Sequence, residues 1–194
     1  MNKQLNRVRK ILAKIVKPRG RHYFLHYIAE RFSKPSILDV GCGNDAVIAV
    51  KRALSNFHYT GIDVEVYNMS DISLLDEYIL VEPSAFADKL GELADSFDVV
   101  ISFHNLEHCL EREKTFRNML RALKKGGLLY LSCPSEKSVH LPSRKGTLNY
   151  YDDQTHTGTP PDFAALKQII AEEGCEILFE AAPYKPFYME FLRL

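Results

Sequence analysis

Residues 36–45 read Ser-Ile-Leu-Asp-Val-Gly-Cys-Gly-Asn-Asp, a short apolar run that leads into a pair of glycines. Its apolar residues at positions 37, 38 and 40 predict a short buried strand. Gly41 and Gly43 then predict a tight turn, in which a missing side chain lets the backbone approach a ligand. Residues 46–54 predict the helix that follows. A strand, a glycine turn and a helix in this order hold a nucleotide-type cofactor in an open α/β sheet.

The glycine pattern alone fits two classes of cofactor. Residues 41–46 match the dinucleotide fingerprint G-x-G-x-x-G/A, and Asp63 stands twenty residues after Gly43, where either class needs a carboxylate for ribose hydroxyls. Asp39 separates the two classes, because it ends the strand two residues before the turn. Two unit charges ~4 Å apart interact by ~4 kcal/mol at an effective dielectric constant of about 20. Asp39 would therefore repel the pyrophosphate of NAD and attract the sulfonium and ammonium of S-adenosylmethionine.

The chain resembles the class I S-adenosylmethionine-dependent methyltransferases of the small bacterial type. The resemblance covers residues 36–179 and rests on four stretches in the family's order: ILDVGCG at 37–43, YTGIDVE at 59–65, FDVVISFHNLEHC at 97–109 and LKKGGLLYLSCP at 123–134. It implies a Rossmann-like α/β fold with a mostly parallel seven-stranded sheet, helices on both faces and a C-terminal antiparallel hairpin. The chain departs from many members at Asp45, where they carry a third glycine.

The same resemblance implies S-adenosyl-L-methionine as the cofactor and S-adenosyl-L-homocysteine as the product. Ligands of open α/β sheets bind beyond the carboxyl ends of the strands, so the expected cofactor contacts follow the predicted strands. They are Asp39, Gly41, Cys42, Gly43, Asp63, Val64, Glu82, Phe103 and His104. Glu82 is expected near the adenine, and Phe103 and His104 near the methyl group.

Length and composition are consistent with one globular domain in a reducing compartment. The chain has 194 residues, 46% hydrophobic content and a formal net charge of zero, so it is not a general polyanion binder. Its four cysteines show no close pairing, which excludes a disulfide framework or a cysteine zinc site and fits the cytoplasm. No apolar run approaches the ~20 residues of a membrane span, and no signal peptide is expected.

We expect four parts in this domain: N-terminal helices at 1–34, the cofactor-binding core at 36–133, a lid or acceptor loop at 134–160, and a C-terminal helix and hairpin at 161–194. Patterning predicts strands at 36–40, 58–63, 78–82, 98–102, 128–133, 175–181 and 187–192, and helices at 2–17, 21–32, 46–54, 86–94, 111–123 and 161–173. The helix at 2–17 is basic on its polar face. It either packs on the domain or docks on an anionic membrane surface or a partner.

Two stretches carry the candidate acceptor chemistry. Residues 103–108 follow the fourth strand, and residues 150–156 lie in the long connection after the fifth. Long connections such as residues 134–160 inside a compact domain are usually functional or disordered. We expect the acceptor to contact Asn105, Tyr150, Tyr151 and Asp152.

A hydroxyl acceptor needs a general base, for which His156 is the first candidate and His108 the second. The alternative for His108 is that it fixes the turn together with Glu107. Metal binding by Asp152, Asp153 and His156 is conceivable, but their spacing matches no strong metal signature, so we expect no metal.

These features predict methyl transfer to a small-molecule or glycan- or lipid-linked acceptor, most simply at oxygen. Cations at Lys137, Arg144 and Lys145 would suit an anionic acceptor or form a solvated face. An enzymatically silent cofactor-binding protein is the alternative, and an NAD-linked oxidoreductase is disfavoured by Asp39. We expect no nucleic-acid substrate, because no amino-methylation motif occurs and the basic residues cluster at the N-terminus.

Overall fold

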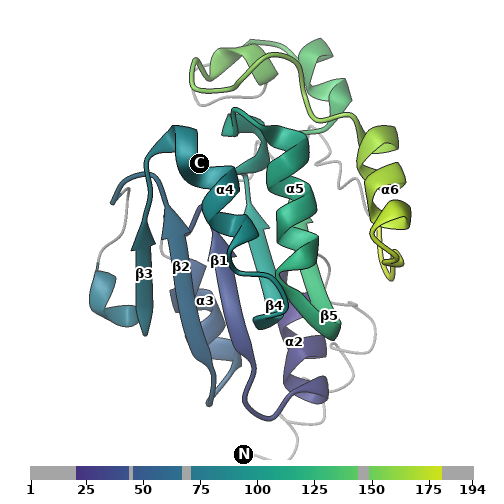
Figure 1. The fold of residues 1–194 in the computed structure, drawn as a ribbon. Helices are drawn as coiled ribbons and strands as arrows, with labels where there is room; N and C mark the ends of the chain where they lie inside the picture. The colour runs from purple at the N-terminus through teal and green to yellow at the C-terminus, as the bar shows by residue number, and fades with distance from the viewer. Residues whose placement is uncertain (1–20, 44–45, 67–70, 144–148, 181–194) are drawn as a thin grey trace, which may run out of the picture.

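Five parallel strands form a single sheet in the computed structural model, which describes residues 21–43, 46–66, 71–143 and 149–180 (Figure 1). The order of the strands across the sheet is β3-β2-β1-β4-β5. Their bounds are β1 Ser36–Val40, β2 His58–Asp63, β3 Glu77–Leu80, β4 Phe97–Phe103 and β5 Leu123–Ser132. This order reverses between β1 and β4, and the crevice at such a switch point is where open α/β sheets bind ligands.

Strand β1 is apolar because both of its faces are covered. Leu38 and Val40 point into one hydrophobic cluster and Ile37 into the other, and all three are at most 1% exposed. Successive side chains of a strand alternate between faces, so a run without polar alternation is expected at the centre of a parallel sheet. Asp39 shares the face of Ile37, where it is fully buried.

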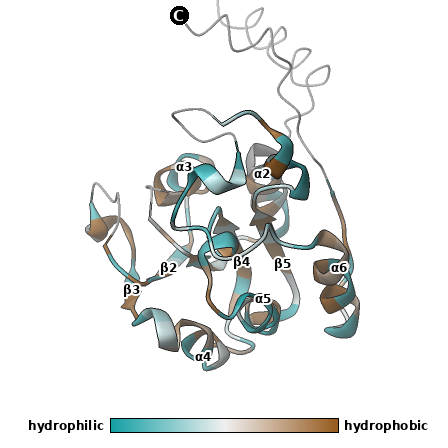
Figure 2. Cartoon of the chain, turned by 90° about the horizontal axis from the view of Figure 1, so that it is seen from above, coloured by the Kyte–Doolittle hydropathy of each residue, from teal (hydrophilic) through white to brown (hydrophobic). Residues whose placement is uncertain are grey.

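Helices cover both faces of the sheet (Figure 2). Helices α4 (Phe86–Gly91), α5 (Arg112–Arg121) and α6 (Phe163–Glu172) belong to the cluster around Leu38. Helices α2 (Arg21–Arg31) and α3 (Ala46–Ala53) belong to the cluster around Ile37. The predicted Rossmann-like class is therefore confirmed. Within the described residues, none of the helices is both long and apolar enough to cross a membrane.

The prediction of seven strands with a C-terminal hairpin was wrong for the described part, which contains five strands. Residues 175–180 form no strand. Gly174, at φ 70°, ends α6 in a left-handed turn, with the Cys175 amide donating to the Ile170 carbonyl at 2.9 Å. The chain then stays beside α6, where Glu180 pairs with Lys167 at 2.9 Å, instead of joining the sheet. The last predicted strand, at 187–192, lies outside the described residues.

Most other predicted elements are confirmed with shifted ends. Strand β5 begins earlier than expected, because Leu123 already pairs with Phe97 before an irregularity in the ladder, and this shortens the predicted helix at 111–123 to α5. Strand β3 and helix α4 end before their predicted limits at 82 and 94. The basic helix predicted at 2–17 lies outside the described residues.

The interior of β2 requires glycine where it passes behind the cofactor turn. A Cβ on Gly61 would lie 2.3 Å from Cδ2 of Leu75 and 2.6 Å from Sγ of Cys42. Both distances are shorter than van der Waals contact, and Leu75 and Cys42 are buried. The packing around Gly61 therefore fixes the distance between β2 and the glycine turn.

We predict that Gly61→Ala lowers the free energy of unfolding by about 1–3 kcal/mol, the usual cost of overpacking a core. Urea denaturation measures this change. The double variant Gly61→Ala with Leu75→Ala has a shorter neighbouring side chain. Its loss of unfolding free energy should therefore be smaller than the sum of the losses in the two single variants. Additive costs would show that the overlap with Leu75 is not the cause.

Candidate active site at the carboxyl ends of the strands

The glycine turn after β1 is pressed against the turn after β4. Gly41 has φ 75°, a conformation that side chains rarely adopt, and a Cβ there would lie 2.4 Å from Cγ of Asn105. The Gly41 amide donates to the Ile62 carbonyl of β2 at 2.9 Å. The structure therefore places Asn105, predicted as an acceptor contact, directly against the cofactor loop.

Asp39 lies beneath this turn and is fully buried. Its Oδ2 accepts a hydrogen bond of 2.5 Å from the hydroxyl of Tyr59. Asp39 therefore lies below the loop and is separated from solvent, so any effect on a bound cofactor would act through its charge and not through direct contact. Burial raises the pKa of the Cys42 thiol, and the charges of Asp39 and Asp63 raise it further. This buried thiol stays protonated, as expected for a packing group in an anionic site.

Asp63 ties the glycine turn to the end of β2. Its Oδ2 accepts from the Gly43 amide at 3.0 Å, and its Oδ1 accepts from the Val64 amide at 2.7 Å. Burial raises the pKa of the Asp63 carboxyl, and these backbone hydrogen bonds oppose the rise. Each carboxylate oxygen has a further lone pair, so this half-buried group has acceptor capacity left for the predicted ribose hydroxyls.

The remaining predicted cofactor residues also lie at this edge of the sheet. Glu82 is exposed just beyond β3, and its side chain caps nothing. The ring centroid of Phe103, at the end of β4, lies 5.0 Å from that of Tyr130, so this side chain is partly buried against the core. Val64 is 40% exposed. The edge thus presents a carboxylate after β2 and another after β3.

His104 begins the turn after β4 in a left-handed conformation, with φ 50°. Its amide donates to the Ser132 carbonyl of β5 at 2.8 Å. Its Nδ1 lies 3.1 Å from Oε1 of Glu107, and this contact raises the pKa of His104. Glu107 is only 1% exposed. The turn therefore carries a carboxylate that is held inside the protein next to an exposed histidine.

Arg112, at the start of α5, holds the long connection in place. We call residues 134–160 the acceptor segment. Arg112 donates to the Thr157 and Thr159 carbonyls of this segment, each at 2.7 Å, and to the Leu106 carbonyl at 3.2 Å. Sequence reasoning missed this role, because one arginine in a charged helix gives no pattern that marks it as an anchor. The guanidinium fixes the segment against the turn after β4.

Tyr150 is the internal anchor of the same segment. It is 2% exposed, and its hydroxyl donates toward the Thr157 and Thr159 carbonyls, at 3.2 and 3.1 Å. The carboxylate of Asp152 also forms hydrogen bonds within the segment, because it accepts from the Asn149 amide and from the Ser143 hydroxyl. Of the predicted acceptor contacts in this segment, Tyr151 is the one presented to solvent, at 60% exposure. Arg144 and Lys145 lie outside the described residues.

The acceptor segment brings His156 to His108, with ring centroids 4.8 Å apart. Nδ1 of His156 lies 2.6 Å from the Tyr150 carbonyl oxygen, and Nδ1 of His108 lies 3.2 Å from that of Thr155. Carbonyl oxygens only accept, so Nδ1 is the donor in each of these contacts. Nδ1 of His108 also lies 3.0 Å from the Thr155 hydroxyl oxygen, and Nε2 of His156 lies 3.9 Å from Oδ2 of Asp153. The two predicted bases thus meet in space.

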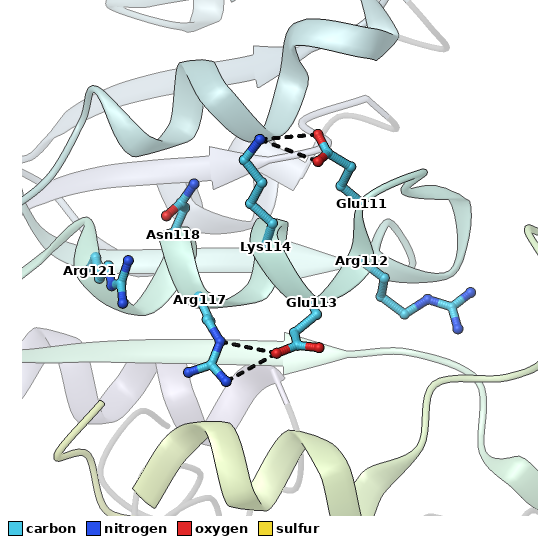
Figure 3. Close-up of a pocket in the computed structure, with 7 residues that line it drawn as sticks. All are labelled: Glu111, Arg112, Glu113, Lys114, Arg117, Asn118 and Arg121. Atoms are coloured by element: carbon cyan, nitrogen blue, oxygen red, sulfur yellow. Dashed lines mark hydrogen bonds and ion pairs between the residues drawn. The ribbon is translucent and has the colours of Figure 1, made fainter. Parts of the chain in front are cut away.

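A concave region lies along α5 and is lined mostly by charged residues (Figure 3). Two of its cations form several ion pairs each: Arg117 with Glu113, Glu172 and Glu173, and Lys114 with Asp88 and Glu111. These pairs link α4, α5 and α6. Arg112 points away from the others in this view. We assign this region to helix packing and the candidate site to the edge described above.

The chain matches the family model of the methyltransferase domain over residues 8–179. It is 28% identical over 123 residues to the ubiquinone biosynthesis O-methyltransferase of Rickettsia prowazekii (strain Madrid E), a match that covers 59% of this chain and 48% of the relative. It is 30% identical over 131 residues to the protein of the same name from Rickettsia akari (strain Hartford), covering 66% and 50%. The chain thus spans about half the length of the curated relatives it matches.

The fold is shared with a solved SAM-dependent methyltransferase from Archaeoglobus fulgidus. The TM-score is 0.55 and the sequence identity 17%, and the match covers 94% of this chain and 87% of the other. The family model covers most of the chain and includes the glycine turn, Asp63 and the turn after β4. The chain therefore belongs to the methyltransferase domain family, whose methyl donor is S-adenosyl-L-methionine.

Proposed function

We propose that this protein transfers the methyl group of S-adenosylmethionine to a hydroxyl oxygen of a small-molecule or glycan- or lipid-linked acceptor. The O-methyltransferase names of the relatives support oxygen as the methyl acceptor. The observation that carries the proposal is the meeting of His108 and His156 beside the turn after β4, where each ring contacts a backbone carbonyl through Nδ1. A hydroxyl needs such a group to remove its proton, whereas the donor already has an activated leaving group.

The donor site is negative where the donor is positive. Asp39 lies under the glycine turn, and Asp63 binds the turn itself. Negative charges at this turn attract a sulfonium and an ammonium, whereas they repel a pyrophosphate. This match supports S-adenosylmethionine over a dinucleotide at the same turn.

The reaction is an in-line displacement. The carbon–sulfur bond of the donor breaks as the carbon–oxygen bond of the product forms, and the hydroxyl proton leaves through the histidine pair. Most of the catalytic contribution comes from holding the two reactants about 3–3.5 Å apart in the correct orientation. The packed turns after β1 and β4 supply that alignment, because Gly41 and Asn105 are in contact.

We predict that Asp63→Asn weakens binding of S-adenosylmethionine and S-adenosylhomocysteine by about tenfold to a hundredfold. The change removes an acceptor for charged hydrogen bonds, which contribute about 1.5–3 kcal/mol each. Isothermal titration calorimetry measures the affinities, with NAD as a comparison ligand that should not bind. Asp88→Asn, at an exposed carboxylate of α4, is the control and should leave the affinities unchanged. Tight binding of NAD, with no binding of the sulfonium donor, would contradict the assignment.

We predict that His156→Asn lowers turnover by roughly a hundredfold or more and leaves the affinity for the donor within about twofold. Asparagine keeps an N–H for the Tyr150 carbonyl but lacks Nε2. Mass spectrometry of products from a panel of phenolic, sugar and lipid-linked hydroxyl acceptors first identifies an acceptor and then measures turnover. His140→Asn, in the exposed part of the same segment, is the matched control. Donor binding without transfer to any of these acceptors would instead indicate a silent binding protein.

A further inference from the structure

Three potential metal ligands converge beside the candidate site: Glu107, His108 and His156, which we call the Glu–His cluster. One ligand atom from each lies within 4.8 Å of the other two. Glu107 and His108 belong to the turn after β4, whereas His156 comes from the acceptor segment. The cluster therefore forms only when these two parts of the chain are packed together.

Both histidines are oriented as metal ligands are. A metal-bound imidazole usually donates its other ring N–H to a carbonyl or carboxylate, which fixes the tautomer and aims the free nitrogen at the ion. Nδ1 of His108 faces the Thr155 carbonyl at 3.2 Å, and Nδ1 of His156 faces the Tyr150 carbonyl at 2.6 Å. Two backbone carbonyls thus contact the two imidazoles at Nδ1, which leaves Nε2 as the nitrogen of each ring that an ion can bind. Nε2 of His156 lies 3.9 Å from Oδ2 of Asp153, a carboxylate that would stand beside the bound ion.

Glu107 provides an independent indication of a cation. It is 1% exposed, and its Oε1 faces Nδ1 of His104 at 3.1 Å. Its Oε2 is buried and has no hydrogen-bond partner within the described part of the chain. Burying a carboxylate oxygen without a donor is costly, and buried charges are normally paired or coordinate metals. A cation among the three ligands would satisfy this oxygen.

We propose that Glu107, His108 and His156 bind a divalent transition-metal ion of the zinc type. Two imidazoles and one carboxylate form a borderline-soft donor set suited to Zn²⁺ and unlike the all-oxygen sites of Mg²⁺ and Ca²⁺. Tetrahedral ligands about 2.0–2.1 Å from zinc lie about 3.4 Å from one another, so the ion draws the side chains together by roughly 1.4 Å at most. Three protein ligands leave a coordination position open, as in catalytic zinc sites.

The ion has two consequences. It joins the acceptor segment to the turn after β4, because its ligands come from both, and it thereby stabilises the folded protein. In the zinc-loaded protein the ion holds the lone pairs of both histidines, so the metal replaces the histidine pair as the group that activates the acceptor hydroxyl. The pKa of an oxygen bound to the ion falls, and its proton leaves to water before the oxygen takes the methyl group. The second consequence rests on the proposed methyl transfer, whereas metal binding and stabilisation do not.

The test uses the full chain, purified without a histidine tag and stripped with a chelator. We expect elemental analysis after incubation with Zn²⁺ and gel filtration to show about one zinc per chain, and a higher midpoint of thermal unfolding than in the stripped protein. His108→Asn and His156→Asn should each weaken zinc binding by about a hundredfold or more and remove the shift in the midpoint. His140→Asn is the matched control and should retain both.

Glu107→Gln should also lose the metal, and the two histidine variants keep the test valid if that buried change prevents folding. Absence of zinc from the wild-type chain, or zinc retained by both histidine variants, would overturn the proposal. A chain that binds zinc through these residues but methylates no acceptor would refute the proposed function and leave the metal site standing. Equal turnover in stripped and zinc-loaded protein would refute the role proposed for the ion in methyl transfer.

Discussion

The contact between Gly41 and Asn105 is the constraint on which the functional edge of this protein depends. The two residues follow neighbouring strands, β1 and β4, and no side chain larger than hydrogen fits at Gly41. Their closeness joins the loop that we propose holds the donor to the turn that we propose carries the acceptor chemistry. In-line methyl transfer requires reacting atoms about 3–3.5 Å apart, and under this proposal the packing of the two turns provides that geometry before either substrate binds.

The acceptor segment is held by polar contacts to its backbone more than by regular structure. A segment with little helix or strand must still satisfy its carbonyl groups. Arg112 and the Tyr150 hydroxyl both bond to the carbonyls of Thr157 and Thr159. This arrangement places His156 against His108, so a cationic side chain on α5 determines where the chemistry of a distant segment lies.

We propose that the carboxylates at this edge serve two different cations, the sulfonium donor and a metal ion. Asp39 accepts a hydrogen bond from a phenol, and Asp63 accepts from two backbone amides. Glu107 is grouped with histidines, which are metal ligands as well as bases. A chain with a formal net charge of zero can thus carry several carboxylates at one edge, while cations of the described part such as Arg117 and Lys124 form ion pairs elsewhere.

The amino-acid sequence alone predicted the order of strands and helices in the core and the glycine turn, because these depend on local periodicity and on residues close in the chain. It marked Asp63 as a candidate cofactor contact. It also identified His108 and His156 as candidates. It did not predict that Tyr150 and Asp152 are used internally, that residues 175–180 stay beside α6, or that Arg112 is an anchor. Those features, and the cluster of Glu107 with the two histidines, were decided by the tertiary structure, since they arise from contacts between segments far apart in sequence that no local pattern records.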